Sequence, residues 1–425
     1  MPLRPARLLV VALTLFSFIG ISAAAEFKRP DPGQLGFDRE RLQRLDQVLE
    51  SYIDQDLLAG QVVMVLRHGQ VAFSAANGWR DKENRVAMTE DTIFRIASQT
   101  KAIVSTGIMI LQEQGKLDIN DPLARYFPEW EEMEVAVSDG NGGYTLEPAR
   151  RQITLRHLLT HTSGVSYGSG PAQKAWEEAG FQGWYFAHMS EPIGAAIARM
   201  GSLPLDQHPG EQWIYGYSID ILGAVIEKAS GQDLATFLQQ ELFNPLNMHD
   251  THFYLPRAKA SRLAKVYHSN GNGLEPNPAG DGMGNQGTYI EGSGANRAYS
   301  GGAGLLSTAR DYARFLQMTL NGGELDGARI LSPKTIELMT TSHLGDIPFR
   351  PGQGFGLGFS IVEDLGTRGS PGSEGEYGWG GAYHSTYWVD PVEDLVVLYF
   401  TQILPATGLD DYNKLRNGIY QAIIE

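Results

Sequence analysis

The chain of 425 residues contains no cysteine, which excludes disulfide bonds, thiolate metal sites and a cysteine nucleophile. Charged residues are also sparse at 20%, and acidic residues outnumber basic ones 49 to 34, for a formal net charge of −15. A surface this acidic argues against nucleic acid or an anionic membrane as a partner. The hydrophobic content of 42% indicates a globular protein of one large or two ordinary domains.

Apolar runs long enough to span a membrane are absent after the N-terminus. There, Arg4 and Arg7 precede apolar residues 8–21, and a run of small residues ends at Ala25. This order is typical of a secretory signal peptide, with an uncleaved membrane anchor as the alternative. The apolar run is short for a span. We therefore predict that the signal peptide 1–25 is removed, that the mature chain 26–425 is periplasmic or secreted, and that it keeps no stable membrane insertion.

Strand patterns lie at the two ends of the mature chain. Residues 61–67 and 70–75 flank a His-Gly turn pair and predict a hairpin, and residues 385–389 and 395–401 form a second strand pair. One antiparallel sheet built from both termini is the economical arrangement. The sequence thus predicts an α+β fold in which the sheet is flanked by helices.

Helical patterns flank these strands and fill the middle of the chain. Apolar spacing predicts helices at 39–53, 99–114, 219–229, 308–320, 333–341 and 410–424. The segment 270–294 is rich in glycine and predicts a long loop. We expect an α/β part, about 26–97 and 300–425, and an inserted, mostly helical part, about 98–299.

Ser98 and Lys101 are the strongest local signal for chemistry. They stand three residues apart at the start of the apolar 99–114 helix, so the hydroxyl and the amine can share a face. A serine hydroxyl needs a neighbouring base to act as a nucleophile, and burial lowers the pKa of a lysine toward that role. The start of a helix also directs N–H groups at a developing oxyanion. By itself the spacing is common, and Ser98 as a helix cap is the alternative.

Several further motifs stand in order along the chain. They are Phe94-Arg95-Ile96-Ala97-Ser98-Gln99-Thr100-Lys101, the segment Leu158-Leu159-Thr160-His161-Thr162-Ser163-Gly164, Tyr215-Gly216-Tyr217, Ser300-Gly301-Gly302-Ala303-Gly304-Leu305 and Trp379-Gly380-Gly381-Ala382. Together they resemble the motifs of the serine β-lactamase and penicillin-binding-protein superfamily. Within it the match is nearest to family VIII carboxylesterases and class C β-lactamase-like hydrolases. The resemblance covers nearly the whole mature chain and implies a β-lactamase/transpeptidase-like fold.

The resemblance also implies roles for individual residues. Ser98 would be the nucleophile that forms an acyl-enzyme, and Lys101 would assist its deprotonation. Tyr215 would be the general base or the proton shuttle to the leaving group. The backbone N–H groups of Ser98 and Ala382 would form the oxyanion hole. No cofactor and no metal is expected.

Two positions depart from the β-lactamase pattern. Tyr217 stands where class C enzymes have asparagine, and Trp379-Gly380-Gly381 replaces the usual Lys-Thr-Gly. These residues are the expected substrate contacts. The resemblance implies a small-molecule ester or amide as the substrate. Because the missing lysine would bind a carboxylate, uncharged esters are favoured within this class. Weak β-lactamase activity, a D-amino-acid peptidase or amidase, and a non-catalytic peptide- or wall-binding protein remain alternatives.

Other residues offer competing interpretations. Ser166 lies in a Gly-x-Ser-x-Gly pattern, but the flanking residues lack the strand and helix that a nucleophile elbow needs. His249 and His252 have the spacing of a metal pair without an evident third ligand. We expect His161 to hold a loop through its ring nitrogens. We expect His384 to be an ordinary strand residue, with a substrate contact as the alternative. The oligomeric state is not indicated.

Overall fold

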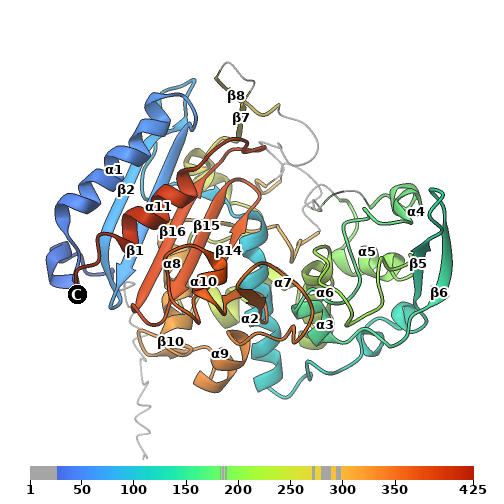
Figure 1. Ribbon diagram of the computed structural model, residues 1–425. Coiled ribbons are helices and arrows are strands. Elements are labelled where there is room, and N and C mark those ends of the chain that lie inside the picture. The colour runs from blue at the N-terminus through green and yellow to red at the C-terminus, as the bar shows by residue number, and fades with distance from the viewer. Residues whose placement is uncertain are drawn as a thin grey trace, which may run out of the picture.

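An antiparallel sheet of eight strands forms the centre of the protein's larger part (Figure 1). The computed structural model describes residues 26–181, 183, 186, 189–269, 273–278, 289–292 and 298–425. The strand order is β12-β13-β14-β15-β16-β1-β2-β3, so β1 (Gly60–Arg67) pairs with β16 (Leu395–Thr401). One sheet built from both ends of the chain is therefore confirmed. Its other strands are β2 (Gln70–Asp81), β3 (Val86–Ala87), β12 (Gln353–Phe355), β13 (Ser360–Val362), β14 (Tyr377–Gly381) and β15 (Ser385–Asp390).

Helices cover both faces of the sheet. Successive residues of a strand point to opposite sides, so neighbouring residues of β1 belong to two different cores. Val63 and Val65 of β1 belong to the core that contains residues of α1 (Arg39–Asp54) and α11 (Asp411–Tyr420). Val62 and Met64 belong to the larger core that contains residues of α2 (Thr100–Glu113) and α8 (Ala309–Leu320). Figure 1 shows α1 and α11 in front of the strands and α2 and α8 behind them. These four helices confirm the predicted ones, although α11 ends earlier than expected.

The chain between α2 and α8 forms a second, mostly helical part, on the right in Figure 1. Its helices are α3 (Leu155–Leu159), α4 (Gln173–Glu178), α5 (Ile193–Met200), α6 (Ser218–Ser230) and α7 (Leu234–Leu238). The sequence pattern did not predict the hairpin of β5 (Glu134–Ser138) and β6 (Tyr144–Pro148) at its outer edge, nor the hairpin of β7 (Tyr267–Ser269) and β8 (Leu274–Pro276). Most of the predicted loop 270–294, like the predicted signal peptide, lies outside the described residues.

Short elements complete the fold and set the start of α2. Strand β4 (Phe94–Arg95) pairs with β9 (Leu306–Ser307), which ties the segment before α2 to the segment before α8. The remaining elements are β10 (Glu324–Leu325), β11 (Ala328–Arg329), α9 (Pro333–Met339) and α10 (Leu365–Arg368). Within the described ranges, no helix has both the length and the apolar character needed to cross a membrane.

Candidate active site

Ser98 lies in a short 3-10 turn, Ala97–Gln99, that joins β4 to α2. Ala97 has a φ of 44°, in the left-handed region that residues with a side chain rarely adopt. Such strain persists where the surrounding structure enforces it, and it is frequent at functional sites. Ser98 is partly exposed while its neighbours are buried, and no side chain caps α2. The alternative that Ser98 serves as a helix cap is therefore not supported.

Lys101 lies buried one turn into α2, with 2% of its surface exposed. Its Nζ atom is 3.3 Å from the Ser98 Oγ, 3.1 Å from the Tyr167 hydroxyl and 2.8 Å from the Gly302 carbonyl oxygen. An ammonium group has three hydrogens to donate, and each finds an oxygen here. The structure thus brings Ser98 and Lys101 together as the spacing predicted.

Tyr215 lies beside Lys101, on the loop before α6. The Lys101 Nζ is 4.5 Å from the centre of the Tyr215 ring, and the Tyr215 hydroxyl accepts a hydrogen bond of 3.1 Å from the indole Nε1 of Trp379. The tryptophan that replaces the third-motif lysine therefore still donates a hydrogen to this hydroxyl. Trp379 therefore contacts Tyr215 as well as lining the cavity.

Tyr167 is a site residue that was not predicted from the sequence. It follows Ser166 in the Gly-x-Ser-x-Gly pattern, and its hydroxyl contacts Lys101. Burial raises the pKa of Tyr167 well above its usual value, and the nearby Tyr215 and Asp220 add to the effect. Tyr167 is therefore a neutral phenol that helps to position the lysine. The Gly-x-Ser-x-Gly pattern thus marks a segment of the site, but the residue that contacts Lys101 is Tyr167 and not Ser166.

A cavity of about 570 Å³ opens above these residues. Of the predicted residues, Ser98, Tyr215 and the segment Trp379 to Ala382 line it, and Lys101 does not. A side chain at Gly381 would place its Cβ 2.6 Å from the carbonyl oxygen of Ile96, so only glycine lets β14 approach the Ser98 turn this closely. The predicted oxyanion donors, the N–H groups of Ser98 and Ala382, stand on these two adjacent segments.

Tyr217 does not line the cavity. Its side chain is 1% exposed, stacks on Trp176 at 6.0 Å and donates a hydrogen bond to the carbonyl of Gly183. Tyr167 packs edge-on against the same ring, with 4.9 Å between the ring centres. The structure thus gives Tyr217 a packing role beneath Tyr167 in place of the expected substrate contact.

Asp220 of α6 holds the segment that contacts Lys101. The carboxylate is fully buried and accepts hydrogen bonds from the Ser300 hydroxyl at 2.6 Å and from the Gly302 N–H at 3.0 Å. Burial raises the pKa of Asp220, while the charge of Lys101 lowers it. The Ser300-Gly301-Gly302 motif is therefore a support for the lysine.

Two histidine expectations need correction. His161 is fully buried, but neither ring nitrogen has a partner among the described residues; the ring instead packs on Tyr215 at 4.8 Å. Its loop contact is made by the backbone, since the His161 carbonyl accepts the N–H of Ile214. His384 lies in the turn between β14 and β15, with a φ of 58°, and pairs with Asp411 at 2.8 Å. It is neither a strand residue nor part of the cavity lining.

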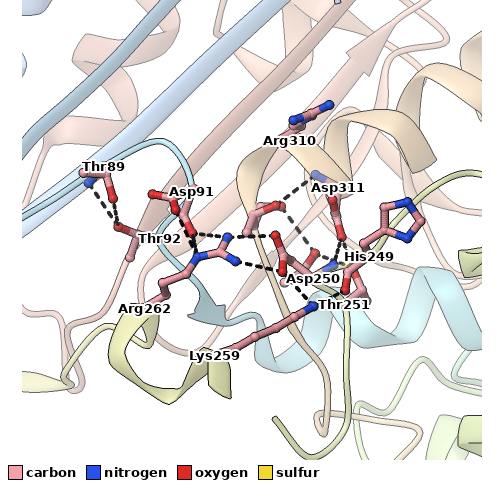
Figure 2. A network of polar contacts seen from close by, with 12 residues as sticks. Thr89, Asp91, Thr92, His249, Asp250, Thr251, Lys259, Arg262, Arg310 and Asp311 are labelled. Carbon is pink, nitrogen blue, oxygen red and sulfur yellow. Dashed lines mark hydrogen bonds and ion pairs between the residues drawn. The ribbon is translucent and has the colours of Figure 1, made fainter. Parts of the chain in front are cut away.

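The competing sites do not form. The Ser166 hydroxyl accepts the N–H groups of Gly168 and Ser169, in a turn without the elbow's strand and helix. Figure 2 shows the surroundings of His249, where Asp250 is paired with Arg262 and Lys259.

His252 has the Nζ of Lys259 3.2 Å from its Nε2, and burial together with this charge lowers its pKa to about 4. A neighbouring lysine disfavours a metal cation. In the part of the chain that the structure covers, no group of three His, Asp or Glu side chains is arranged to hold a metal ion.

Comparison with known proteins finds a matching family and several similar proteins. The beta-lactamase family model matches residues 45–420. The chain is similar to an uncharacterized protein of Mycobacterium tuberculosis, with 34% identity over 84% of this chain and 89% of that one. It is also similar to esterase EstB of Burkholderia gladioli, with 32% identity over 87% and 93% of the two chains. Among solved structures, EstCE1, a hydrolase with promiscuous acyltransferase activity, matches with a TM-score of 0.75 and 29% identity over 92% and 99% of the chains.

Proposed function

Because the chain belongs to the beta-lactamase family, we propose that it is a serine hydrolase of the carboxylesterase type that works through an acyl-enzyme on Ser98. Similarity to proteins named as esterases supports the reaction class. The observation that carries the assignment of the nucleophile is the contact of the buried Lys101 amine with the Ser98 hydroxyl at the floor of a cavity.

The proposed reaction has two halves. The Ser98 Oγ attacks the ester carbonyl carbon, and its proton passes to the base formed by Tyr215 and Lys101. The same groups return that proton to the alkoxide, which leaves as the alcohol. The N–H groups of Ser98 and Ala382 stabilise the oxyanion, with a rate contribution of about a hundredfold or more for each donor. Water then attacks the carbonyl carbon of the acyl-enzyme and gives a proton to the same base. The base returns this proton to the Ser98 Oγ as the acid leaves, which restores the free enzyme.

The test is covalent labelling with a fluorophosphonate probe, followed by assays on short- and long-chain 4-nitrophenyl esters. We expect the wild-type protein to be labelled, the Ser98→Ala variant to be unlabelled and inactive, and the matched Ser166→Ala variant to keep both properties. An inactive Ser166→Ala variant beside a fully active Ser98→Ala variant would overturn the assignment. Well-folded protein that takes no label would favour a non-catalytic binding protein.

The alternative substrates are ranked in the same assay. Nitrocefin reports β-lactam hydrolysis, and peptides ending in D-alanine report peptidase activity. Similarity to proteins named as esterases is the observation that places esters first. Rates on either alternative substrate that exceed those on the esters would reverse this order.

We also propose that the protein is exported to the periplasm or beyond the cell. The support is the sequence pattern alone: Arg4, Arg7, the apolar residues 8–21 and the small residues that end at Ala25. N-terminal sequencing of the mature protein tests this proposal. We expect a mature chain that begins at Glu26, and an intact N-terminus in the soluble cytoplasmic fraction would contradict it.

A further inference from the structure

Arg350 brings a cation to the cavity that contains Ser98. It lies on the loop before β12, is exposed, and lines the same cavity. Its guanidinium carbon is 4.7 Å from the centre of the Trp379 ring and 5.2 Å from that of Phe349, and these two rings are stacked with an angle of 22° between them. A guanidinium stacks well on aromatic faces. The two rings therefore fix the orientation of the guanidinium group, and its N–H groups can still donate hydrogen bonds.

Arg350 differs in its pairing from the other arginines of the cavity. Arg368 and Arg416 also line it, and both bind the carboxylate of Glu376, at 2.9 and 2.7 Å. No carboxylate of the described residues forms an ion pair with Arg350. Arg350 therefore keeps its positive charge available at the cavity, although the chain as a whole carries a formal net charge of −15. Its position at the cavity lets it attract an anion toward Ser98.

We propose that Arg350 binds a carboxylate carried by the substrate, so that the enzyme prefers esters with a second, anionic group. This inference rests on the proposed esterase function and names its substrate class. A planar guanidinium binds a carboxylate through two parallel N–H bonds, which fixes orientation as well as charge. Arg350 stacks on Trp379, the residue that replaces the third-motif lysine, and so restores from another loop the positive charge that the motif lacks. The expectation of uncharged esters followed from Trp379 alone.

A different role for Arg350 predicts a different kinetic result. In this alternative Arg350 acts on the chemical step through Tyr215, which is near enough to raise the pKa of Arg350 while burial lowers it. An effect on Tyr215 changes the chemical step for every ester equally. A carboxylate subsite changes kcat/KM, mainly through KM, for the anionic ester of a matched pair and leaves the neutral ester unchanged.

The experiment uses two matched pairs of esters that place the carboxylate on either side of the scissile bond. Mono-(4-nitrophenyl) glutarate and its methyl ester test the acyl side, and 4-acetoxybenzoate and its methyl ester test the alcohol side. For Arg350→Gln we expect kcat/KM to fall about tenfold or more for the anionic member of one pair, and less than about twofold for both neutral esters. Arg350→Lys should lie between, and added salt should shrink the wild-type preference. The control Arg44→Gln removes the same charge from an exposed position on α1 and should change neither pair.

Three results would overturn the proposal. An equal fall in kcat/KM on all four esters would mean that Arg350 acts through Tyr215. The other two are an unchanged kcat/KM on every ester and a wild-type enzyme that does not prefer the anionic ester of either pair. Binding of monomethyl glutarate to Ser98→Ala, measured by calorimetry, tests the subsite without turnover. Loss of that binding in the Ser98→Ala/Arg350→Gln double variant supports the subsite even if the esters tested are not hydrolysed. Equal binding by both variants contradicts it.

Discussion

Helices α2 and α8 pack into the same core behind the sheet, but they begin in opposite ways. The start of α8 is secured by its own side chains: the Thr308 hydroxyl accepts the N–H of Asp311 at 3.1 Å, and the Asp311 carboxylate accepts the N–H of Asp250 at 2.7 Å (Figure 2). The start of α2 has no side-chain cap.

The start of α2 is instead held from outside. The Leu305 N–H donates to the Thr100 hydroxyl at 3.1 Å, and the Tyr312 hydroxyl of α8 donates to the Gln99 carbonyl at 2.8 Å. Because neighbouring segments fix this turn, the Ser98 hydroxyl is not needed to cap it. The side chains at the start of α8 therefore stabilise the fold. Those at the start of α2, Ser98 and Lys101, are not used for capping and can take part in catalysis.

The sharpest test of this contrast is Lys101→Met. The variant keeps the length of the side chain and removes the amine that contacts Ser98, so we expect kcat to fall about a thousandfold or more. The Gly302 carbonyl and the Tyr167 hydroxyl lose a buried hydrogen-bond donor, so we expect the thermal midpoint to fall by about a few degrees without unfolding the protein. Lys116→Met, at an exposed position, is the control. A variant that unfolds, or one that keeps its activity, would contradict the division of roles.

At the start of α8, Asp311→Asn should change the pH dependence of stability. Burial raises the pKa of Asp311 to about 6 from 3.8, with the nearby Asp250 carboxylate contributing and Arg310 opposing. The folded state thus binds more protons than the unfolded state between these values, so stability falls as pH rises from about 4 to about 6. Both hydrogen bonds end on the same carboxylate oxygen, which an asparagine retains.

We expect Asp311→Asn to remove this loss, which is at most about 3 kcal/mol, and to leave esterase activity unchanged. Urea unfolding at several pH values between 4.5 and 7.5 measures it. An unaltered pH profile in the variant would show that Asp311 does not titrate as its burial predicts.

Trp379→Phe tests whether the indole N–H assists the chemistry at the α2 end. Phenylalanine keeps an aromatic face beneath Arg350 and removes the donor to the Tyr215 hydroxyl. We expect kcat for neutral esters to fall about tenfold, with little change in KM, because the Tyr215 hydroxyl loses its hydrogen-bond donor. A rise in KM alone would mean that Trp379 contacts the substrate without acting on Tyr215.

The smallest effect is expected from Thr308→Ala. Loss of this cap should lower the free energy of unfolding by about 1 kcal/mol, because the N–H of Asp311 loses its acceptor. The kcat should not change, since no reacting group is touched. A fall in kcat without a fall in stability would erase the distinction between the two helix starts.

The sheet and its covering helices were predictable because each leaves a periodic pattern in the sequence. The short hairpins β5/β6 and β7/β8 were not, since pairs of three to five residues leave little periodic signal and depend on tertiary contacts. Among the site residues, Ser98, Lys101 and Tyr215 stand in recognisable motifs, and the structure places all three together.

Other parts of the site depend on packing that no spacing reveals. Tyr217 occupies a motif position, yet its ring turns into an aromatic cluster. Arg350 stands in no recognised motif, and it lines the cavity from the loop before β12, an edge strand of the sheet. The aromatic surroundings of His161 likewise depend on rings from distant segments, including Phe355 and Trp213.

The pairing of β1 with β16 has a consequence for the timing of synthesis. Ser98 leaves the ribosome early, whereas β14 and Ala382 are among the last segments to be made, and β16 follows them. A nascent chain therefore carries its nucleophile for most of translation without the strand that completes the cavity. We therefore expect an unfinished or truncated polypeptide to have no esterase activity, because the cavity that contains Ser98 is incomplete without β14.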